Sequence, residues 1–115
     1  MSITGLAVSI ASPLPKLDSF DRYLFIGPHP DDIEIGAGAT AAKLVQSGKA
    51  VAFLCCIDGR FGSDTVPPEE LIQMRRAEAT VSAAALGVTD VRFLPFCDGG
   101  FYEQNELKSA IARIV

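Results

Sequence analysis

The feature that most limits the possible folds is the segment Ala50–Ile57, which is apolar at every position. A strand with one face in water alternates polar and apolar residues. An unbroken apolar run therefore predicts a strand that is covered on both faces, as in parallel sheets. Two shorter segments, Tyr23–Ile26 and Val91–Leu94, predict further strands because they are rich in aromatic and branched residues.

Helices are predicted between and after these strands. The first runs from about Ile35 to Gln46 and ends at Ser47-Gly48, since glycine commonly follows a helix. The second opens at Pro67-Pro68, with acidic residues in its first turn, where the helix dipole favours anions. Its buried face is predicted from apolar residues at steps of three and four: Leu71, Met74, Ala77, Val81 and Ala84. The last helix begins near Asn105.

The order strand, helix, strand, helix, strand, helix predicts an α/β fold. With right-handed crossovers it forms the first half (βαβαβα) of a Rossmann-like, doubly wound, mainly parallel three-layer sheet, with the first strand at one edge. Residues Met1 to Phe20 contain Pro13 and Pro15 and show no sustained periodicity. They are predicted to form an irregular arm with at most one short edge strand, so that residues 21–115 carry the sheet.

Composition excludes several classes of function. A chain of 115 residues with a net charge of −4 forms one domain at most and offers no basic surface for nucleic acid or anionic membranes. No apolar stretch is long enough to span a membrane, and no basic start precedes the N-terminal apolar patch, so a cytoplasmic location is expected. Three cysteines, Cys55, Cys56 and Cys97, fit a reduced compartment and are assigned no role.

The loop after the first predicted strand carries the only histidine, in the sequence Gly27-Pro28-His29-Pro30-Asp31-Asp32. Loops at the carboxyl ends of parallel strands are where open α/β sheets bind ligands. His29 and Asp32 are close enough along a proline-stiffened loop to face one metal ion, and Asp31 could then lie near a metal-bound water. The alternative is a plain turn in which Asp31 or Asp32 caps the following helix.

The motif His29-Pro30-Asp31-Asp32, entered from an apolar strand and followed by Gly36-Ala37-Gly38-Ala39-Thr40, resembles the signature of the LmbE/PIG-L family. Members of that family are zinc-dependent deacetylases of N-acetylated amino sugars and related amides. The resemblance implies Zn²⁺ held by His29 and Asp32, and a metal-bound water as nucleophile with Asp31 as general base. The implied substrate is a linear amide of the N-acetylglucosamine type.

Further matches lie at the ends of the other two strands. Ile57-Asp58-Gly59 resembles the family's Thr-Asp-Gly-Glu loop, although isoleucine comes first and Arg60 replaces the glutamate. By the same resemblance, Arg75 is expected to reach the substrate, and Asp98 is expected to contact sugar hydroxyls. The alternatives are an exposed Arg75–Glu78 ion pair and a simple turn at Asp98-Gly99.

The resemblance covers only the first half of the family's domain, and the third zinc ligand of the family is a histidine in the second half. The chain is therefore expected to be a fragment with an incomplete site, and activity of residues 1–115 alone is doubtful. In such a half-sheet the edge of the Tyr23–Ile26 strand has no partner, so association of copies through this edge is expected.

A competing hypothesis is a dinucleotide-binding module that uses Gly36, Gly38 and Asp58. Gly36-Ala37-Gly38-Ala39-Thr40-Ala41 matches G-x-G-x-x-A, and Asp58 ends the second strand. That fingerprint needs its first glycine in the turn directly after the strand, whereas here the residues from Pro28 to Ile35 intervene. The spacing therefore favours the metal site.

Overall fold

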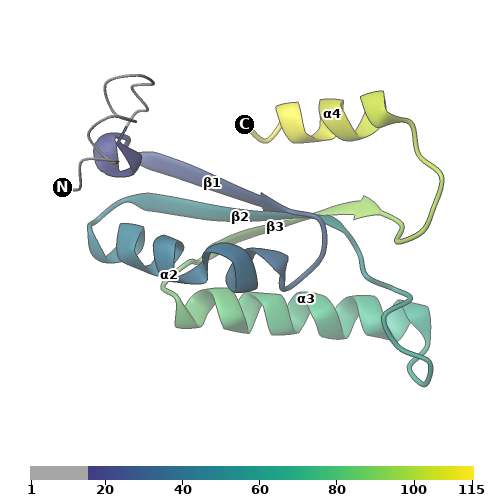
Figure 1. The fold of residues 1–115 in the computed structure, drawn as a ribbon. Coiled ribbons are helices and arrows are strands. Elements are labelled where there is room, and N and C mark those ends of the chain that lie inside the picture. The colour runs from purple at the N-terminus through teal and green to yellow at the C-terminus, as the bar shows by residue number, and fades with distance from the viewer. Residues whose placement is uncertain (1–15) are drawn as a thin grey trace, which may run out of the picture.

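The computed structural model describes residues 16–115, and the sequence predictions for the preceding arm lie outside them, apart from a short 3₁₀ turn, η1 (Leu17–Ser19). Three strands alternate with three helices, as predicted (Figure 1). The elements are β1 (Arg22–Gly27), α2 (Asp32–Gln46), β2 (Ala50–Ile57), α3 (Pro68–Ala85), β3 (Asp90–Phe96) and α4 (Gln104–Ala112). Helix α2 begins at Asp32 rather than near Ile35, because a sharp turn at Asp31 leads directly into it.

The sheet is parallel throughout, in the order β1-β2-β3, and this confirms the α/β fold and the edge position of the first strand. Phe25 of β1 pairs with Phe53 of β2, which pairs in turn with Val91 of β3. Helices α2 and α3 cover one face of the sheet, and α4 lies on the other (Figure 1). Because the strands are parallel, all three run in the same direction and end at the same edge of the sheet.

Side chains of β2 alternate between two cores, which explains why its sequence does not alternate. On one face Phe53 and Cys55 belong to a cluster with residues of α2 and α3, among them Ile33, Ala41 and Ala83. On the other face Leu54, Cys56 and Ile57 pack with Leu107, Ile111 and Ile114, in and just after α4. Both faces of the central strand are thus buried, as the apolar run predicted.

The predicted buried face of α3 was wrong. Of its members only Leu71 is buried, whereas Met74 and Val81 are 42% and 71% exposed, and Ala77 and Ala84 also face outward. The residues that are buried are Leu71, Ile72, Ala79 and Ala83. In an alanine-rich helix the small side chains allow close approach to the sheet, so the spacing of the largest apolar residues is a poor guide to the buried face.

The packing of the cysteines leads to a prediction about their reactivity. Burial, with a smaller contribution from Glu34, raises the pKa of Cys55 to about 11, and burial also raises the pKa of Cys56. Cys97 is only half-buried. Since the thiolate is the reactive form, iodoacetamide at pH 8 should label Cys97 well before the other two. Intact-mass measurement, with denatured protein as the fully labelled control, tests this; equal labelling in the native state would contradict it.

Candidate active site

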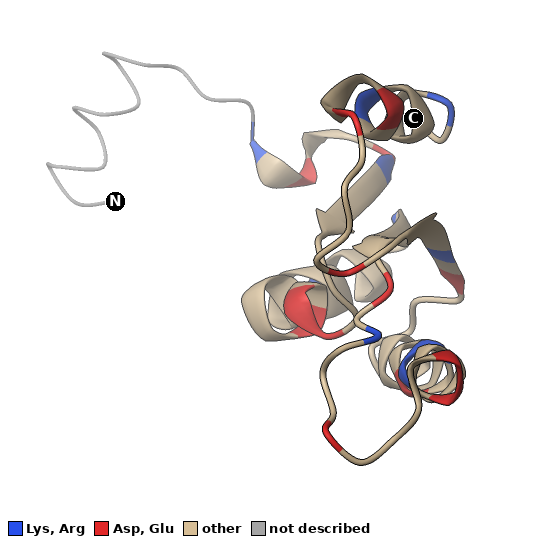
Figure 2. Cartoon of the chain, turned by 90° about the vertical axis from the view of Figure 1, so that its right-hand side faces the viewer, with Lys and Arg blue, Asp and Glu red and all other residues tan. Residues whose placement is uncertain are grey.

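Backbone hydrogen bonds join the ends of all three strands. The amide of Ile57 donates to the carbonyl of Pro28 (2.7 Å), and the amide of Asp58 donates to the carbonyl of Phe96 (3.0 Å). The loops after β1, β2 and β3 therefore lie side by side at the carboxyl edge of the sheet. Figure 2 looks onto this end, where acidic residues mark the start of α2 and the loops.

The loop after β1 is forced into a tight turn under α2. A Cβ at Gly27 would lie 2.7 Å from Cγ1 of Ile33, so only glycine fits where the strand ends. Asp31 then takes a φ of 115°, in the left-handed region that L-residues rarely adopt. Such a conformation costs about 1–3 kcal/mol and is concentrated at functional sites. The turn brings His29, Asp31 and Asp32 close together before the helix begins.

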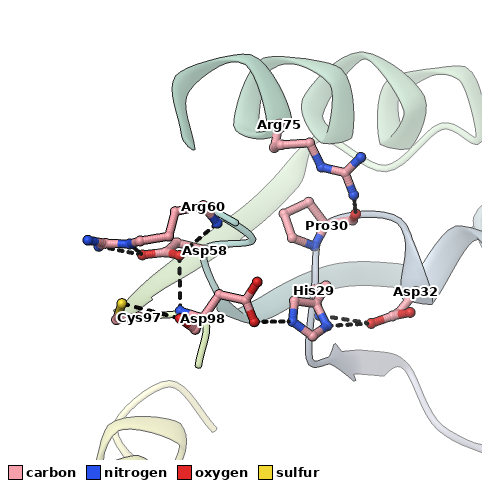
Figure 3. Close-up of polar contacts among 8 residues, drawn as sticks. All are labelled: His29, Pro30, Asp32, Asp58, Arg60, Arg75, Cys97 and Asp98. Carbon is pink, nitrogen blue, oxygen red and sulfur yellow. Dashed lines mark hydrogen bonds and ion pairs between the residues drawn. The ribbon is translucent and has the colours of Figure 1, made fainter. Parts of the chain in front are cut away.

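His29 lies between two carboxylates (Figure 3). Asp32 Oδ2 accepts a hydrogen bond from the backbone N–H of His29 (2.9 Å) and lies 3.5 Å from its Nδ1. The other ring nitrogen, Nε2, is 3.0 Å from Oδ1 of Asp98, in the loop after β3. The structure thus brings together three of the residues singled out in the sequence, and one of them comes from a distant part of the chain.

The spacing of His29 and Asp32 fits a zinc ion. Two ligand atoms bound tetrahedrally to zinc at about 2.0–2.2 Å are about 3.4 Å apart. The 3.5 Å between Nδ1 and Oδ2 is close to this separation. Among residues 16–115 no group of three or more His, Cys, Asp or Glu side chains is placed to hold a metal ion. The described residues therefore offer two ligand atoms at a suitable spacing.

Asp31 and Arg75 form a second group, on the side of the loop that faces α3. One guanidinium nitrogen of Arg75 donates to the carbonyl of Pro30 (2.6 Å) and to Oδ2 of Asp31 (3.0 Å). Arg75 thus contacts the loop instead of forming the exposed pair with Glu78 that was the alternative. Asp31 occupies the N-cap position of α2, yet its side chain makes no capping bond. Asp32 bonds the amide of His29, which precedes the helix. Helix capping does not account for these carboxylates.

The contact between Asp58 and Arg60 was not predicted from the sequence. Asp58 is 4% exposed, and its carboxylate accepts bonds from Nε and a terminal nitrogen of Arg60 (3.0 and 2.7 Å). Burial by itself would raise the pKa of Asp58, but these bonds and those from the amides of Arg60 and Asp98 hold the pKa below its ordinary value. Gly59, with a φ of 70°, folds Arg60 back over Asp58. The sequence Asp58-Gly59-Arg60 directly after a buried strand places both partners in one loop, but the positive φ of Gly59 that brings them together is visible only in the structure.

The structure does not support the dinucleotide hypothesis. Gly36 and Gly38 lie inside α2, beyond its first turn, and not in the turn that follows β1. A Cβ at Gly38 would be in ordinary contact with Leu86, at 3.5 Å, so this glycine packs against the end of α3. The carboxylate of Asp58, which would have to bind a ribose, is occupied by Arg60.

The fold of this chain is similar to that of a solved deacetylase. The structure of N,N'-diacetylchitobiose deacetylase from Pyrococcus horikoshii is similar over 99% of this chain and 46% of its own, with a TM-score of 0.81 and 28% identity. The chain belongs to the PIG-L family, whose model, described as GlcNAc-PI de-N-acetylase, matches residues 24–115.

Two curated relatives are deacetylases of acetylated sugars. The first, 1D-myo-inositol 2-acetamido-2-deoxy-alpha-D-glucopyranoside deacetylase from Kineococcus radiotolerans, is 38% identical over 99 residues. The second, diacetylchitobiose deacetylase from Thermococcus kodakarensis, is 36% identical over 96 residues. The matches cover 80% and 82% of this chain but only 27% and 36% of the relatives. The chain therefore spans about a third of the length of these relatives, and the resemblance inferred from the His29 motif is confirmed.

Proposed function

We propose that this chain forms part of a zinc-dependent hydrolase that removes the acetyl group from an N-acetylated sugar or a related linear amide. The observation that carries the proposal is the 3.5 Å spacing of His29 Nδ1 and Asp32 Oδ2, at the edge of the sheet where α/β proteins bind ligands. Membership of a family whose curated relatives are named as sugar deacetylases supports the same reaction.

In this proposal His29 and Asp32 hold the zinc, and Asp31 is the general base. When bound, zinc would lower the pKa of a water ligand and polarise the amide carbonyl. Asp31 takes a proton from the attacking water and later delivers it to the leaving nitrogen. A carbon–oxygen bond forms, the carbon–nitrogen bond breaks, and acetate and the free amine leave. The contact with Arg75 holds Asp31 in its strained position, ready to accept that proton.

Arg75 and Asp98 are proposed to bind the substrate. A guanidinium carries five N–H donors, and the contacts of Arg75 with the loop use one terminal nitrogen, so others are free to reach sugar hydroxyls. Asp98 bonds His29 through Oδ1, while its second carboxylate oxygen points away from the imidazole (Figure 3). That oxygen can accept a hydrogen bond from a hydroxyl group of the sugar.

Several broader expectations from the sequence accompany this proposal. Residues 21–115 are the first half of the deacetylase domain, and the remaining zinc ligand comes from outside the described residues. The edge of β1 would mediate contact between copies, nucleic acid is not a partner, and the location is cytoplasmic. Within residues 16–115 no helix is both long and apolar enough to cross a membrane.

The test is a deacetylation assay on the full-length protein. Acetate release from diacetylchitobiose and from an N-acetylglucosamine–inositol conjugate should be lost on treatment with a chelator and restored by Zn²⁺. Release that a chelator does not affect would overturn the zinc assignment, and no release from any N-acetylated sugar would overturn the reaction. Titration with NAD(H) serves as the control for the competing hypothesis and should show no binding.

A further inference from the structure

The buried pair of Asp58 and Arg60 is connected to His29 by a short chain of contacts. Oδ1 of Asp58 accepts a hydrogen bond from the backbone N–H of Asp98 (3.2 Å), and the side chain of Asp98 reaches Nε2 of His29 (3.0 Å). Arg60 donates to the other oxygen, Oδ2, of Asp58. The path Arg60–Asp58–Asp98–His29 therefore connects the loops after all three strands (Figure 3).

Asp58 has no capacity left for chemistry of its own. Its two oxygens accept four bonds from Arg60 and Asp98, and it is 4% exposed. A buried carboxylate is tolerated when it is paired and hydrogen-bonded in this way. Asp58 instead acts on the structure of the loop after β3. Gly99 and Gly100 follow Asp98 in this loop, and glycine allows the backbone to adopt many conformations. The bond to the amide of Asp98 fixes the point from which that side chain extends.

Asp98 in turn decides which nitrogen of His29 is available to a metal. A carboxylate oxygen accepts hydrogen bonds, so the 3.0 Å contact favours the tautomer of neutral His29 in which Nε2 donates to Asp98 and Nδ1 keeps a free lone pair. Nδ1 is the nitrogen that lies 3.5 Å from Asp32 Oδ2. A carboxylate that orients a metal-binding histidine through its second nitrogen typically contributes about 10–100-fold to metal affinity.

We propose that Arg60 and Asp58 are positioning residues: they hold Asp98 where its carboxylate fixes the tautomer and orientation of His29, and so present Nδ1 to the zinc. This inference rests on the proposed function for the identity of the metal. It assigns a role to Arg60, the residue that departs from the glutamate of the family's loop.

A matched control exists at the opposite end of the sheet. Arg92 also donates two bonds, from Nε and a terminal nitrogen, to an aspartate two residues away along the chain, Asp90, at 2.9 and 2.8 Å. That pair lies at the start of β3, far from the loops that carry His29. Arg60→Ala and Arg92→Ala each remove a pair of such bonds, so Arg92→Ala is the control for losing an arginine–aspartate pair that is exposed and remote from His29.

The first measurement is zinc affinity, by competition with a chromophoric chelator. In the full-length protein Arg60→Ala and Asp98→Asn should each weaken zinc binding about 10–100-fold, while Arg92→Ala leaves it unchanged. The double variant of Arg60 and Asp98 should be little worse than Asp98→Asn alone, because both changes act on the same contact. Additive losses, or equal effects of Arg60→Ala and Arg92→Ala, would overturn the proposal.

The second measurement is nitrogen NMR of the His29 ring in metal-free protein, with its signal assigned by its loss in His29→Gln. Wild-type protein and Arg92→Ala should show the proton on Nε2, and Arg60→Ala should show a mixture of tautomers. A fixed Nε2–H form in Arg60→Ala would refute the positioning role. This readout does not need zinc, so protein that binds no zinc would refute the proposed function and leave this test intact. If Arg60→Ala fails to fold, Arg60→Lys serves in its place, because lysine keeps the charge but cannot donate both bonds to Asp58. Its His29 nitrogen chemical shifts should lie between those of the Nε2–H form and those of a mixture of tautomers.

Discussion

Replacing His29 with alanine should leave the full-length protein without stoichiometric zinc and without deacetylase activity. His29 supplies the only imidazole in the chain, and its Nδ1 is one of the two ligand atoms whose 3.5 Å spacing fits a shared ion. Loss of a direct ligand should reduce metal affinity by more than the about 10–100-fold expected for an orienting residue. Elemental analysis of the purified variant measures the zinc content directly.

The control for this change is Asp21→Asn, which removes a charge at the far end of β1, where Asp21 pairs with Lys49 at 3.7 Å. That variant should keep both zinc and activity. Zinc that stays at the wild-type level in His29→Ala would show that the metal binds elsewhere, and the assignment of His29 and Asp32 as ligands would then fail.

The two neighbouring aspartates should respond differently to amidation. Asp31→Asn should keep zinc but reduce kcat by about 100 to 10,000-fold, the usual cost of losing a general base. The amide oxygen of asparagine can still accept the bond from Arg75 that holds this part of the loop. Asp32→Asn should instead weaken zinc binding, because the neutral amide is a poorer zinc ligand than the carboxylate beside His29 Nδ1.

The zinc affinity of both variants, together with kcat measured at saturating zinc, separates these roles. If Asp31→Asn loses the metal and Asp32→Asn keeps it, the ligand and the base are exchanged. If both variants keep zinc and full turnover, neither residue belongs to the active site, and the loop would be a turn of purely structural importance.

The sequence predicts the sheet well because its strands are marked by burial on both faces. Ala50–Ile57 was predicted to the residue, since an apolar run of this length between two glycine-containing breaks is typical of a buried strand and short for a helix. Helix α3 shows the opposite case: its existence was clear from Pro68 and the acidic first turn, but its buried face was not. Alanines occur on all sides of it, and tertiary packing alone decides which of them face the sheet.

The candidate site was only partly predictable, for a different reason. His29, Asp31 and Asp32 lie within one loop, so a local motif reveals them. The contact between His29 and Asp98 joins residues 69 positions apart and depends on the parallel register that aligns the ends of β1, β2 and β3. The bonds of Arg60 to Asp58 depend on the positive φ of Gly59. Neither the register nor that backbone turn can be read from the residue types alone.

At Asp31 the left-handed backbone lowers the stability of the fold, while the side chain is the proposed general base. Glycine would adopt a φ of 115° without strain, so a glycine there would relieve about 1–3 kcal/mol while removing the proposed base. A mutation from Asp31 to glycine would therefore increase stability and abolish the proposed activity, and only selection for turnover opposes it. In a lineage that no longer needs the reaction, this residue should be among the first in the loop to change, and glycine should be its commonest replacement. The identity of residue 31 would then indicate whether a member of the family still carries out hydrolysis.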